Sequence, residues 1–285
     1  MANATLNGLA WTVASGFLFM ILNAVVRNLT LALDPFQVQF LRYFAGLVVM
    51  LPWIIRAGIA AYKPNGLGGQ LGRGVVHTFG LLLWFYALPH VPLADVAAIG
   101  FSTPIFVMLG AAWFLGERMF TARWVAALIA FGGVLIVLAP KLTGAVGFYA
   151  LVMLASAPVF AASYLITKVL TKRDRVEVIV AWQALTITVL TIPFALVDWT
   201  WPSATQWGWV LAAGILGSAG HYCMGRAFAI ADISAMQSVK FLELVWATLL
   251  GLIIFSDPPS GATLIGGAVI VAATVWIARY EARRG

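Results

Sequence analysis

The composition of this chain excludes an ordinary soluble domain. Of its 285 residues, 62% are hydrophobic and only 9% are charged, whereas soluble domains carry roughly 25% charged residues. The net charge of +7 would suggest nucleic-acid binding in a soluble protein, but here the basic residues lie mostly in short loops between apolar runs, which is typical of membrane topology. The single cysteine, Cys223, excludes an intrachain disulfide and a cysteine-rich metal site.

Apolar runs of about 20 residues recur from one end of the chain to the other. Runs of this length cross the ~30 Å hydrocarbon core of a bilayer as helices. They are apolar on all sides instead of alternating, which argues against the strands of a membrane barrel. The sequence therefore predicts an all-α integral membrane protein with ten transmembrane helices, at residues 8–28, 36–55, 71–88, 93–115, 124–138, 147–170, 176–196, 207–230, 234–255 and 262–280. The first run lacks the basic start of a signal peptide, so we expect it to be retained.

Lysine and arginine are distributed unequally between the two sides of the predicted bundle. Arg27 and Lys141 lie on one side, and Arg42 and Lys240 lie within predicted helices. Because basic residues concentrate in cytoplasmic loops, we expect both termini to be cytoplasmic, on the side that holds the remaining bases: Arg56, Lys63, Arg73, Arg118, Arg123, Lys168, Lys172, Arg173, Arg175, Arg226, Arg279, Arg283 and Arg284.

The order of segments repeats within the chain. When residues 87–138 are shifted by 140 they lie over 227–278 without a gap, so that Glu117 meets Asp257. The repeat predicts two five-helix halves, residues 1–140 and 141–285, that together form one transmembrane domain. Because each half holds an odd number of helices, the halves must be inverted relative to each other. Inverted repeats are typical of transporters, whose substrate site lies near the midplane where the halves meet.

The segment 86–140 resembles the repeat of the drug/metabolite transporter superfamily, in its ten-helix EamA-like branch. The features that carry the resemblance are the Ala87-Leu88 turn, Pro104 within a helix, Gly116-Glu117-Arg118, and the pair Gly132-Gly133. The second half is a degenerate copy, with Leu244 where the proline would be and Asp257 in place of the glutamate. The aromatic-rich helices look closest to the exporters of aromatic and other amphipathic amino acids.

The resemblance implies a central cavity surrounded by helices one to four and six to nine, and alternating access without a covalent step. The expected protein is therefore not an enzyme and needs no cofactor or metal. We expect it to export a small molecule, an aromatic or other neutral amino acid, across the bacterial inner membrane. The other expected partner is the lipid bilayer, not nucleic acid, and the expected state is a monomer or a weak homodimer.

Two formal charges, Lys240 and Glu243, lie in the apolar run of residues 234–257. Charges inside the bilayer are expensive and usually mark a pathway or face a watery cavity. Lys240 would attract a substrate carboxylate and Glu243 a substrate ammonium, which suits a zwitterion. Alternatively the two neutralise each other as a structural i,i+3 pair. Their counterparts in the first half are Gly100 and Thr103, so the fold does not require charge there, which favours substrate recognition.

Polar and aromatic residues at helical spacing complete the predicted substrate site. Their polar groups need partners away from lipid, although ordinary helix packing explains many small polar residues as well. His77 and His221 are also candidate proton carriers, since histidine titrates near neutral pH. Arg42 is predicted either to snorkel or pair with an acid, or to contact substrate. The predicted substrate-binding residues besides Lys240 and Glu243 are Asn23, His77, Trp84, Ser163, Tyr164, His221 and Tyr222.

Pro104 and Pro158 lie near mid-membrane, where each removes a backbone hydrogen bond. They are candidate hinges for alternating access, or static kinks that shape the cavity.

The sequence leaves alternatives to amino-acid export. Within transport, cationic drugs, nucleosides or other small metabolites are alternative substrates. A polytopic membrane enzyme is a remote alternative, because the sequence has no HExxH, P-loop or nucleophile–histidine–acid pattern. A channel is disfavoured because no ring of like charges suggests a selectivity filter.

Overall fold

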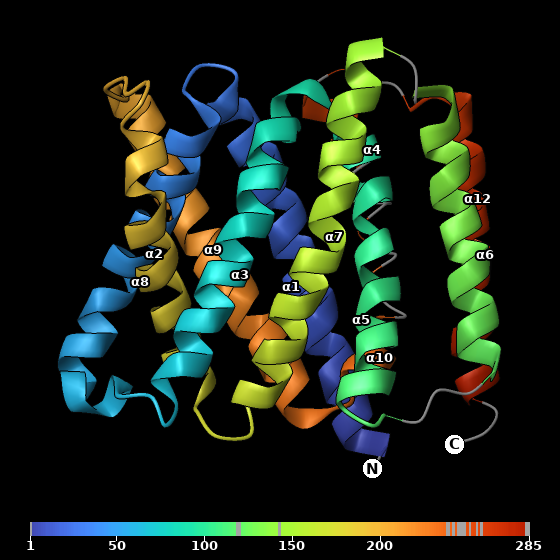
Figure 1. Cartoon of the computed structure of the whole chain (residues 1–285), viewed down its shortest axis with the longest axis horizontal. Helices are drawn as coiled ribbons and strands as arrows, with labels where there is room; N and C mark the ends of the chain where they lie inside the picture. Colours follow the sequence, from blue (N-terminus) through green and yellow to red (C-terminus); the bar gives the residue numbers. More distant parts are fainter. Residues whose placement is uncertain are drawn as a thin grey trace.

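The fold is known from a computed structural model that describes residues 2–117, 121–141, 144–237, 240, 243, 249–250, 252–254, 256 and 259–282. These residues form long helices that run side by side through the molecule (Figure 1), and no strand occurs among them. The helices are α1 (Ala2–Thr30), α2 (Pro35–Ala57), α3 (Leu67–Ala87), α4 (Leu93–Gly100), α5 (Ser102–Phe114), α6 (Thr121–Leu138), α7 (Gly144–Leu170), α8 (Val176–Ala195), α9 (Ala204–Ile230), α10 (Ile233–Met236) and α12 (Gly261–Ala282). Short 3-10 turns occupy Ile59–Tyr62, Leu88–His90 and Ala139–Lys141.

Five segments are long and apolar enough to cross a membrane, namely Asn7–Thr30, Pro35–Ala57, Leu67–His90, Gly147–Leu170 and Val176–Ala195. Each coincides with a segment expected from the sequence, which confirms a helical membrane protein. Most of the ninth expected segment lies outside the described residues. The count of ten spanning helices therefore stays a prediction.

The expected fourth segment, 93–115, is divided into α4 and α5 at Phe101. Pro104 explains the division, because a proline lacks the N–H donor and its ring clashes with the carbonyl four residues earlier, here that of Gly100. The Ser102 hydroxyl donates instead to the carbonyl of Ile99 at 2.7 Å. By contrast, α7 continues through Pro158 without interruption.

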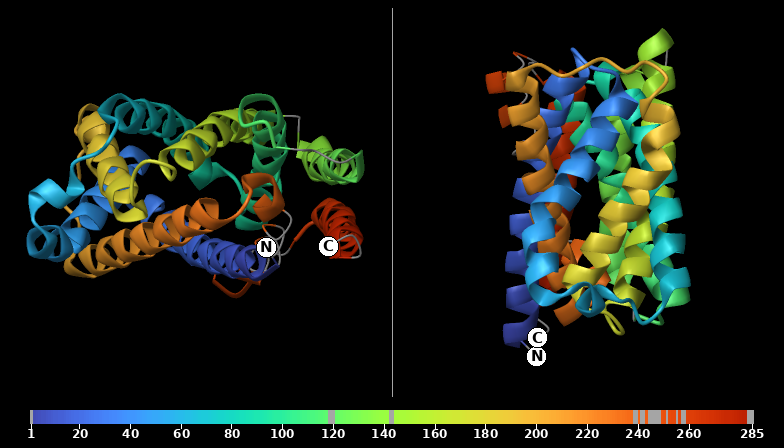
Figure 2. Two further views of the ribbon diagram at one scale, coloured as in Figure 1. Left: turned by 90° about the horizontal axis from the view of Figure 1, so that it is seen from below. Right: turned by 90° about the vertical axis from the view of Figure 1, so that its left-hand side faces the viewer.

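The long helices pack in pairs, and each pair joins a helix from the first half of the chain to one from the second half. α1 packs along α9, and α7 packs along α3, while α2 lies against α8 and α6 against α12. First and sixth segments, and third and eighth, thus occupy equivalent places, as an inverted repeat requires. α6 and α12 stand at one edge of the bundle (Figure 2), and α1 begins at the same end of the molecule at which α12 finishes.

Polar side chains fix several helix ends. Asp34 accepts hydrogen bonds from the N–H groups of Phe36 and Gln37 at the start of α2. Glu117 reaches a different element: its carboxylate accepts from the N–H groups of Ile233 and Ser234, both at 3.1 Å. This carboxylate caps the start of α10.

Candidate substrate cavity

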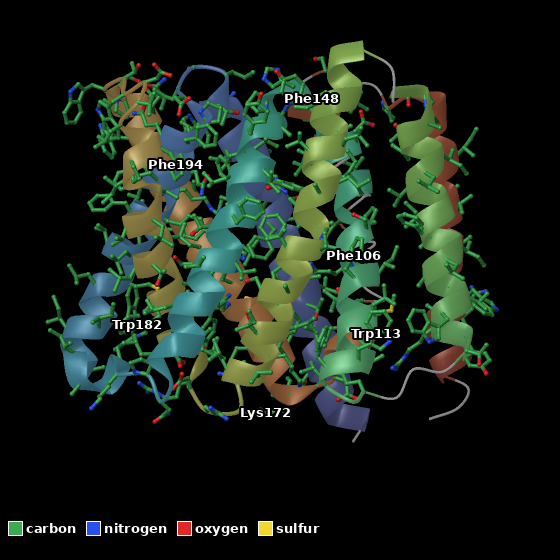
Figure 3. The ribbon with its side chains drawn as sticks, in the orientation of Figure 1. Phe106, Trp113, Phe148, Lys172, Trp182 and Phe194 are labelled. Carbon is green, nitrogen blue, oxygen red and sulfur yellow. The ribbon has the colours of Figure 1, made fainter. Side chains whose placement is uncertain are left out.

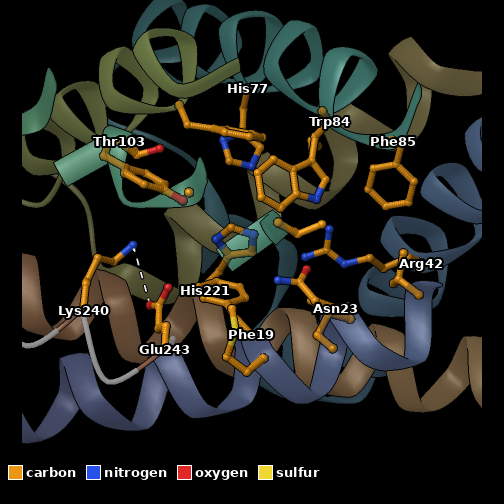
Figure 4. A pocket seen from close by; sticks show the side chains of 18 of the residues that line it. Phe19, Asn23, Arg42, His77, Trp84, Phe85, Thr103, His221, Lys240 and Glu243 are labelled. Carbon is orange, nitrogen blue, oxygen red and sulfur yellow. Dashed lines mark ion pairs between the residues drawn. The ribbon is translucent and has the colours of Figure 1, made fainter. Parts of the chain in front are cut away.

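A cavity lies inside the bundle between α1, α2, α3, α7 and α9. It holds about 810 Å³ of empty space, including the part that opens to solvent. Aromatic, aliphatic and charged side chains converge on it (Figure 4). Its walls are Phe19, Met20, Leu22, Asn23, Val26, Arg42, Tyr43, His77, Leu81, Trp84, Phe85, Val96, Gly100, Thr103, Phe160, Tyr164, His221, Lys240 and Glu243.

Lys240 and Glu243 both face the cavity and form a loose pair. Lys240 Nζ lies 3.9 Å from Glu243 Oε1, which is beyond hydrogen-bonding distance. The ammonium also lies 5.1 Å from the centre of the Tyr164 ring, within cation–π range. Glu243 Oε1 is buried and has no hydrogen-bond partner among the described residues. The pair is neutral as a unit, yet it leaves hydrogen-bonding capacity that a ligand can use.

Gly16 on α1 makes room for the Glu243 carboxylate. A Cβ atom at position 16 would lie 2.9 Å from Glu243 Oε1. This close approach explains why a glycine occupies the polar stripe of the first helix beside Ser15, whose hydroxyl bonds the carbonyl of Gly220 at 2.9 Å. The stripe thus serves packing between α1 and α9 as well as the cavity.

His77 and His221 meet in the cavity wall, with ring centres 5.4 Å apart. His77 Nδ1 lies 2.9 Å from the Ser163 hydroxyl, so Ser163 sits behind the histidine and fixes its ring. His221 Nε2 lies 3.4 Å from both the Tyr43 hydroxyl and Gln183 Nε2. Its Nδ1 is buried and has no hydrogen-bond partner among the described residues.

Aromatic rings cover the middle of the cavity. The Phe160 ring is stacked with that of Tyr164 at 6.4 Å and meets Trp84 edge-on at 6.0 Å. From α1, Phe19 packs on His221 at 4.9 Å. These separations are those of favourable aromatic pairs, and rings that line the cavity suit a flat, conjugated ligand.

Arg42 enters the cavity from α2, on the side opposite the Lys240–Glu243 pair (Figure 4). It is only 6% exposed, and its guanidinium carbon lies 4.5 Å from the Tyr43 ring centre. The expected pairing with an acid does not occur, since the described part of the chain shows no ion pair for this arginine. Asp34 is instead the cap of α2.

Arg73 lies one turn before His77 on α3. We expected it among the basic residues of the cytoplasmic side, but its side chain is buried and only 1% exposed. Neutral groups satisfy it: Nε donates to the Thr167 hydroxyl at 2.5 Å, Nη1 to the carbonyl of Ile179 at 3.2 Å, and Nη2 to Gln183 Oε1 at 2.8 Å. Through Gln183 this arginine is connected to His221.

Most of the predicted substrate-binding residues line this one cavity: Asn23, His77, Trp84, Tyr164, His221, Lys240 and Glu243. Ser163 lies in the layer behind His77. Tyr222 does not line the cavity. Its hydroxyl accepts from Arg226 Nη1 at 3.1 Å and its ring packs on Trp11, because neighbouring helical residues point about 100° apart and His221 already faces inward.

The predicted set omitted several cavity residues. Phe19, Phe160 and Tyr43 are aromatic residues on the inner face of their helices. The signal that would have found Phe160 and Phe19 was their position on the polar stripes of α7 and α1. Thr103, the counterpart of Glu243 in the repeat, also reaches the cavity, one residue before Pro104. Among the described residues, no three His, Cys, Asp or Glu side chains gather as a metal ion would require.

Comparisons with known proteins place the chain among transporters. It matches the profile described as the EamA-like transporter family twice, over residues 6–139 and 147–279. A riboflavin transporter of Rhizobium johnstonii is 34% identical over 280 residues, covering 97% of this chain and 92% of the relative. The pseudopaline exporter CntI of Pseudomonas aeruginosa is 29% identical, covering 96% of this chain and 97% of the relative.

A solved crystal structure shares the fold. It superposes with a TM-score of 0.73 at 23% sequence identity, covering 100% of this chain and 99% of the other. The likeness extends over the entire helical arrangement.

Proposed function

This chain belongs to the EamA-like transporter family, and on that premise we propose that it carries small amphipathic metabolites across the membrane by alternating access. It is a multi-pass protein of the bacterial inner membrane. The proposed topology has ten helices in two inverted five-helix repeats, 1–140 and 141–285, with both termini in the cytoplasm. Binding in the central cavity involves no chemical change.

The observation that carries this proposal is the composition of the cavity. Its middle is aromatic, through Trp84 and Phe160, while the Lys240–Glu243 pair and Arg42 bring charge to it. A molecule with a flat ring and polar ends matches both features, because rings stack on aromatic faces and charge-assisted hydrogen bonds hold the ends. Asn23, His221 and Tyr164 add hydrogen-bonding groups at the wall.

Two substrate classes fit this description. An aromatic or other neutral amino acid uses the Lys240–Glu243 pair, whose loose geometry leaves Glu243 Oε1 without a hydrogen bond among the described residues. Riboflavin is the second candidate, supported by the relative at 34% identity that is named for it. A cationic drug fits less well, because Arg42 brings a positive charge that no described acid pairs with. We propose export as the direction, as the relative named an exporter suggests.

Solute counterflow in proteoliposomes tests the proposal without assuming a direction or a coupling ion. Vesicles loaded with unlabelled riboflavin or L-tryptophan should accumulate the labelled compound when they contain the protein. We expect Lys240→Ala to lower the exchange rate at least tenfold, and Trp201→Phe, at an exposed position, to leave it unchanged. Exchange no faster than in protein-free vesicles for both compounds would contradict the substrate assignment, and full exchange by Lys240→Ala would remove Lys240 from the site.

A further inference from the structure

We infer that Arg42 is an anion-binding group and that the preferred substrate carries an oxyanion, a carboxylate or a phosphate, next to its aromatic part. The inference rests on the proposed transport through this cavity and narrows the class of molecule that it takes. It starts from the unequal charge of the two sides of the cavity.

The Lys240–Glu243 side is neutral, since the two charges lie 3.9 Å apart. Arg42 is different. Its side chain is only 6% exposed. In the described part of the chain it forms no ion pair, and its Nε has no hydrogen-bond partner. A buried cation is costly unless a partner compensates it. The ring of Tyr43 at 4.5 Å supplies only part of that compensation.

Arg73 shows what a structural arginine looks like in this bundle. Each of its three guanidinium nitrogens donates to a protein oxygen, those of Thr167, Ile179 and Gln183. Arg42 is also buried but borders the cavity, and its Nε has no hydrogen-bond partner among the described residues. Arg73 is therefore satisfied by the protein itself, as a structural residue is. Arg42 keeps an unsatisfied donor beside the cavity, as a ligand-binding residue does.

The neighbouring helix leaves the guanidinium free to meet a ligand. Gly217 on α9 lies directly against it, and a Cβ atom there would lie 3.0 Å from Nε and 3.1 Å from Nη2. A small side pocket of about 230 Å³, lined by Arg42, Gly46, Gly214, Gly217 and other residues, adjoins the same group. The glycines therefore set the position of the charge, and the planar fork is suited to bidentate contact with an oxyanion.

The side of the cavity on which Arg42 lies also restricts the shape of the substrate. Trp84, His77 and His221 lie between Arg42 and the Lys240–Glu243 pair (Figure 4). An anionic group at Arg42 therefore places the attached ring against these aromatic side chains, and any amine or hydroxyl on the far end reaches Glu243. The class is an elongated aromatic acid or phosphate ester.

Matched ligand pairs test the assignment. Indole-3-propionate and its neutral amide differ only in the carboxylate, and flavin mononucleotide and riboflavin differ only in the phosphate. Binding of all four to the purified full-length protein is measured by isothermal titration calorimetry. We expect the anionic member of at least one pair to bind about tenfold more tightly than the neutral one, and the pair that shows it identifies which oxyanion is recognised. Arg42→Gln should abolish the preference and Arg42→Lys should keep part of it.

A second variant guards against misfolding of the Arg42 variants. Gly217→Ala keeps the charge but presses on the guanidinium, and we expect it to weaken the preference at least threefold. Its control is Gly208→Ala on the same helix, where a Cβ atom meets nothing within 4 Å, and whose preference should equal that of the wild type. Equal binding of both members of each pair, or a preference that survives Arg42→Gln, would overturn the inference. Counterflow of riboflavin or tryptophan by the same preparation would then show that the transport proposal stands without it.

Discussion

At the scale of single residues, the two buried arginines show how much a side chain's partners decide about its role. Arg73 has a structural role, because its hydrogen bonds to Thr167, Ile179 and Gln183 connect α3 to α7 and α8. Lysine could not replace it, since an ammonium cannot span three acceptors arranged around a planar group. Its role is to hold helices and, through Gln183, to orient His221.

We predict that Arg73→Lys destabilises the protein by about 1–3 kcal/mol, because at least one buried acceptor loses its hydrogen bond. Thermal unfolding of the purified protein, followed by intrinsic tryptophan fluorescence, measures the change. Arg56→Lys at an exposed position is the control and should leave the melting temperature unaltered. A melting temperature of Arg73→Lys equal to that of the control would mean that the network contributes little.

Sequence reasoning reached part of the site at this scale. Charge inside an apolar run led to Lys240 and Glu243, and polar stripes led to Asn23, His77 and His221, all of which line the cavity. It ranked Arg42 as a snorkelling residue because spacing alone does not tell which way a long side chain turns. Tyr222 was wrongly included because it follows His221 directly. Neighbouring residues on a helix point about 100° apart, so one faces the cavity and the other faces the packing side.

At the scale of elements, helix ends are held by side chains from other helices. Glu117, after α5, accepts hydrogen bonds from the N–H groups of Ile233 and Ser234 at 3.1 Å and from the Ser234 hydroxyl at 2.5 Å. The side chain of Arg123, in the first turn of α6, donates to that same hydroxyl at 3.2 Å. The residues that start α10 therefore depend on the first half of the chain.

Glu117→Ala should lower stability by about 1–2 kcal/mol, since it removes the cap and leaves N–H groups without an acceptor. Chemical or thermal unfolding reports the loss. Asp198→Ala, at an exposed carboxylate, provides the comparison and is expected to change stability by less than ~0.5 kcal/mol. If both variants unfold alike, the contact does not stabilise α10.

The packing of α6 on α12 depends on a pair of facing glycines. A Cβ atom at Gly133 would lie 2.7 Å from the carbonyl oxygen of Gly266, and one at Gly266 would lie 2.4 Å from that of Gly133. Glycine permits such close backbone approach in membrane helices. This pair therefore serves a helix contact within the chain.

Adjacent substitutions separate packing from helix propensity. Gly133→Ala should push α6 and α12 apart and lower the melting temperature by several degrees, about 1–3 kcal/mol. Gly132→Ala, where the added Cβ atom meets nothing within 4 Å, should leave the melting temperature equal or slightly higher. The opposite ranking of the two variants would contradict the packing account.

Helix positions were predictable at this scale because long apolar runs leave little choice of secondary structure. The expected segments match α1, α2, α3 and α6 to α9 closely. The division of the fourth segment was predicted only as a kink at Pro104. The clash with the carbonyl of Gly100 ends one helix and starts another, and that outcome depends on the packing around Ser102.

At the scale of the whole molecule, the packing of α1 on α9 and of α7 on α3 is the arrangement that the predicted inverted repeat requires. α1 with α9 and α7 with α3 build the two long walls around the cavity, whereas its charged side chains come from elsewhere, namely Arg42 on α2 and the pair Lys240 and Glu243. The arrangement of the helices is therefore similar in the two halves, whereas the charged side chains of the cavity are not. The pairing of the halves was predictable from the repeat, but the substrate class was not, because it depends on side-chain directions within the shared cavity.

The proposed topology predicts which loops face the cytoplasm. In a Cys223→Ala background, Lys172→Cys between α7 and α8 (Figure 3) and Asp198→Cys between α8 and α9 lie at opposite ends of α8. A membrane-impermeant maleimide should label Asp198→Cys in intact cells and Lys172→Cys only after permeabilisation. Labelling with the reverse pattern would place the termini outside the cytoplasm.

The central claim is that Lys240 and Glu243 face a ligand and do more than neutralise each other. Exchanging them, Lys240→Glu with Glu243→Lys, tests it most directly, because the swapped chain keeps the i,i+3 ion pair and the net charge while it inverts what the cavity presents. We predict that counterflow in proteoliposomes falls at least tenfold while the melting temperature stays within a few degrees of the wild type. Exchange at the wild-type rate by the swapped protein would show that the pair is structural and contradict the account.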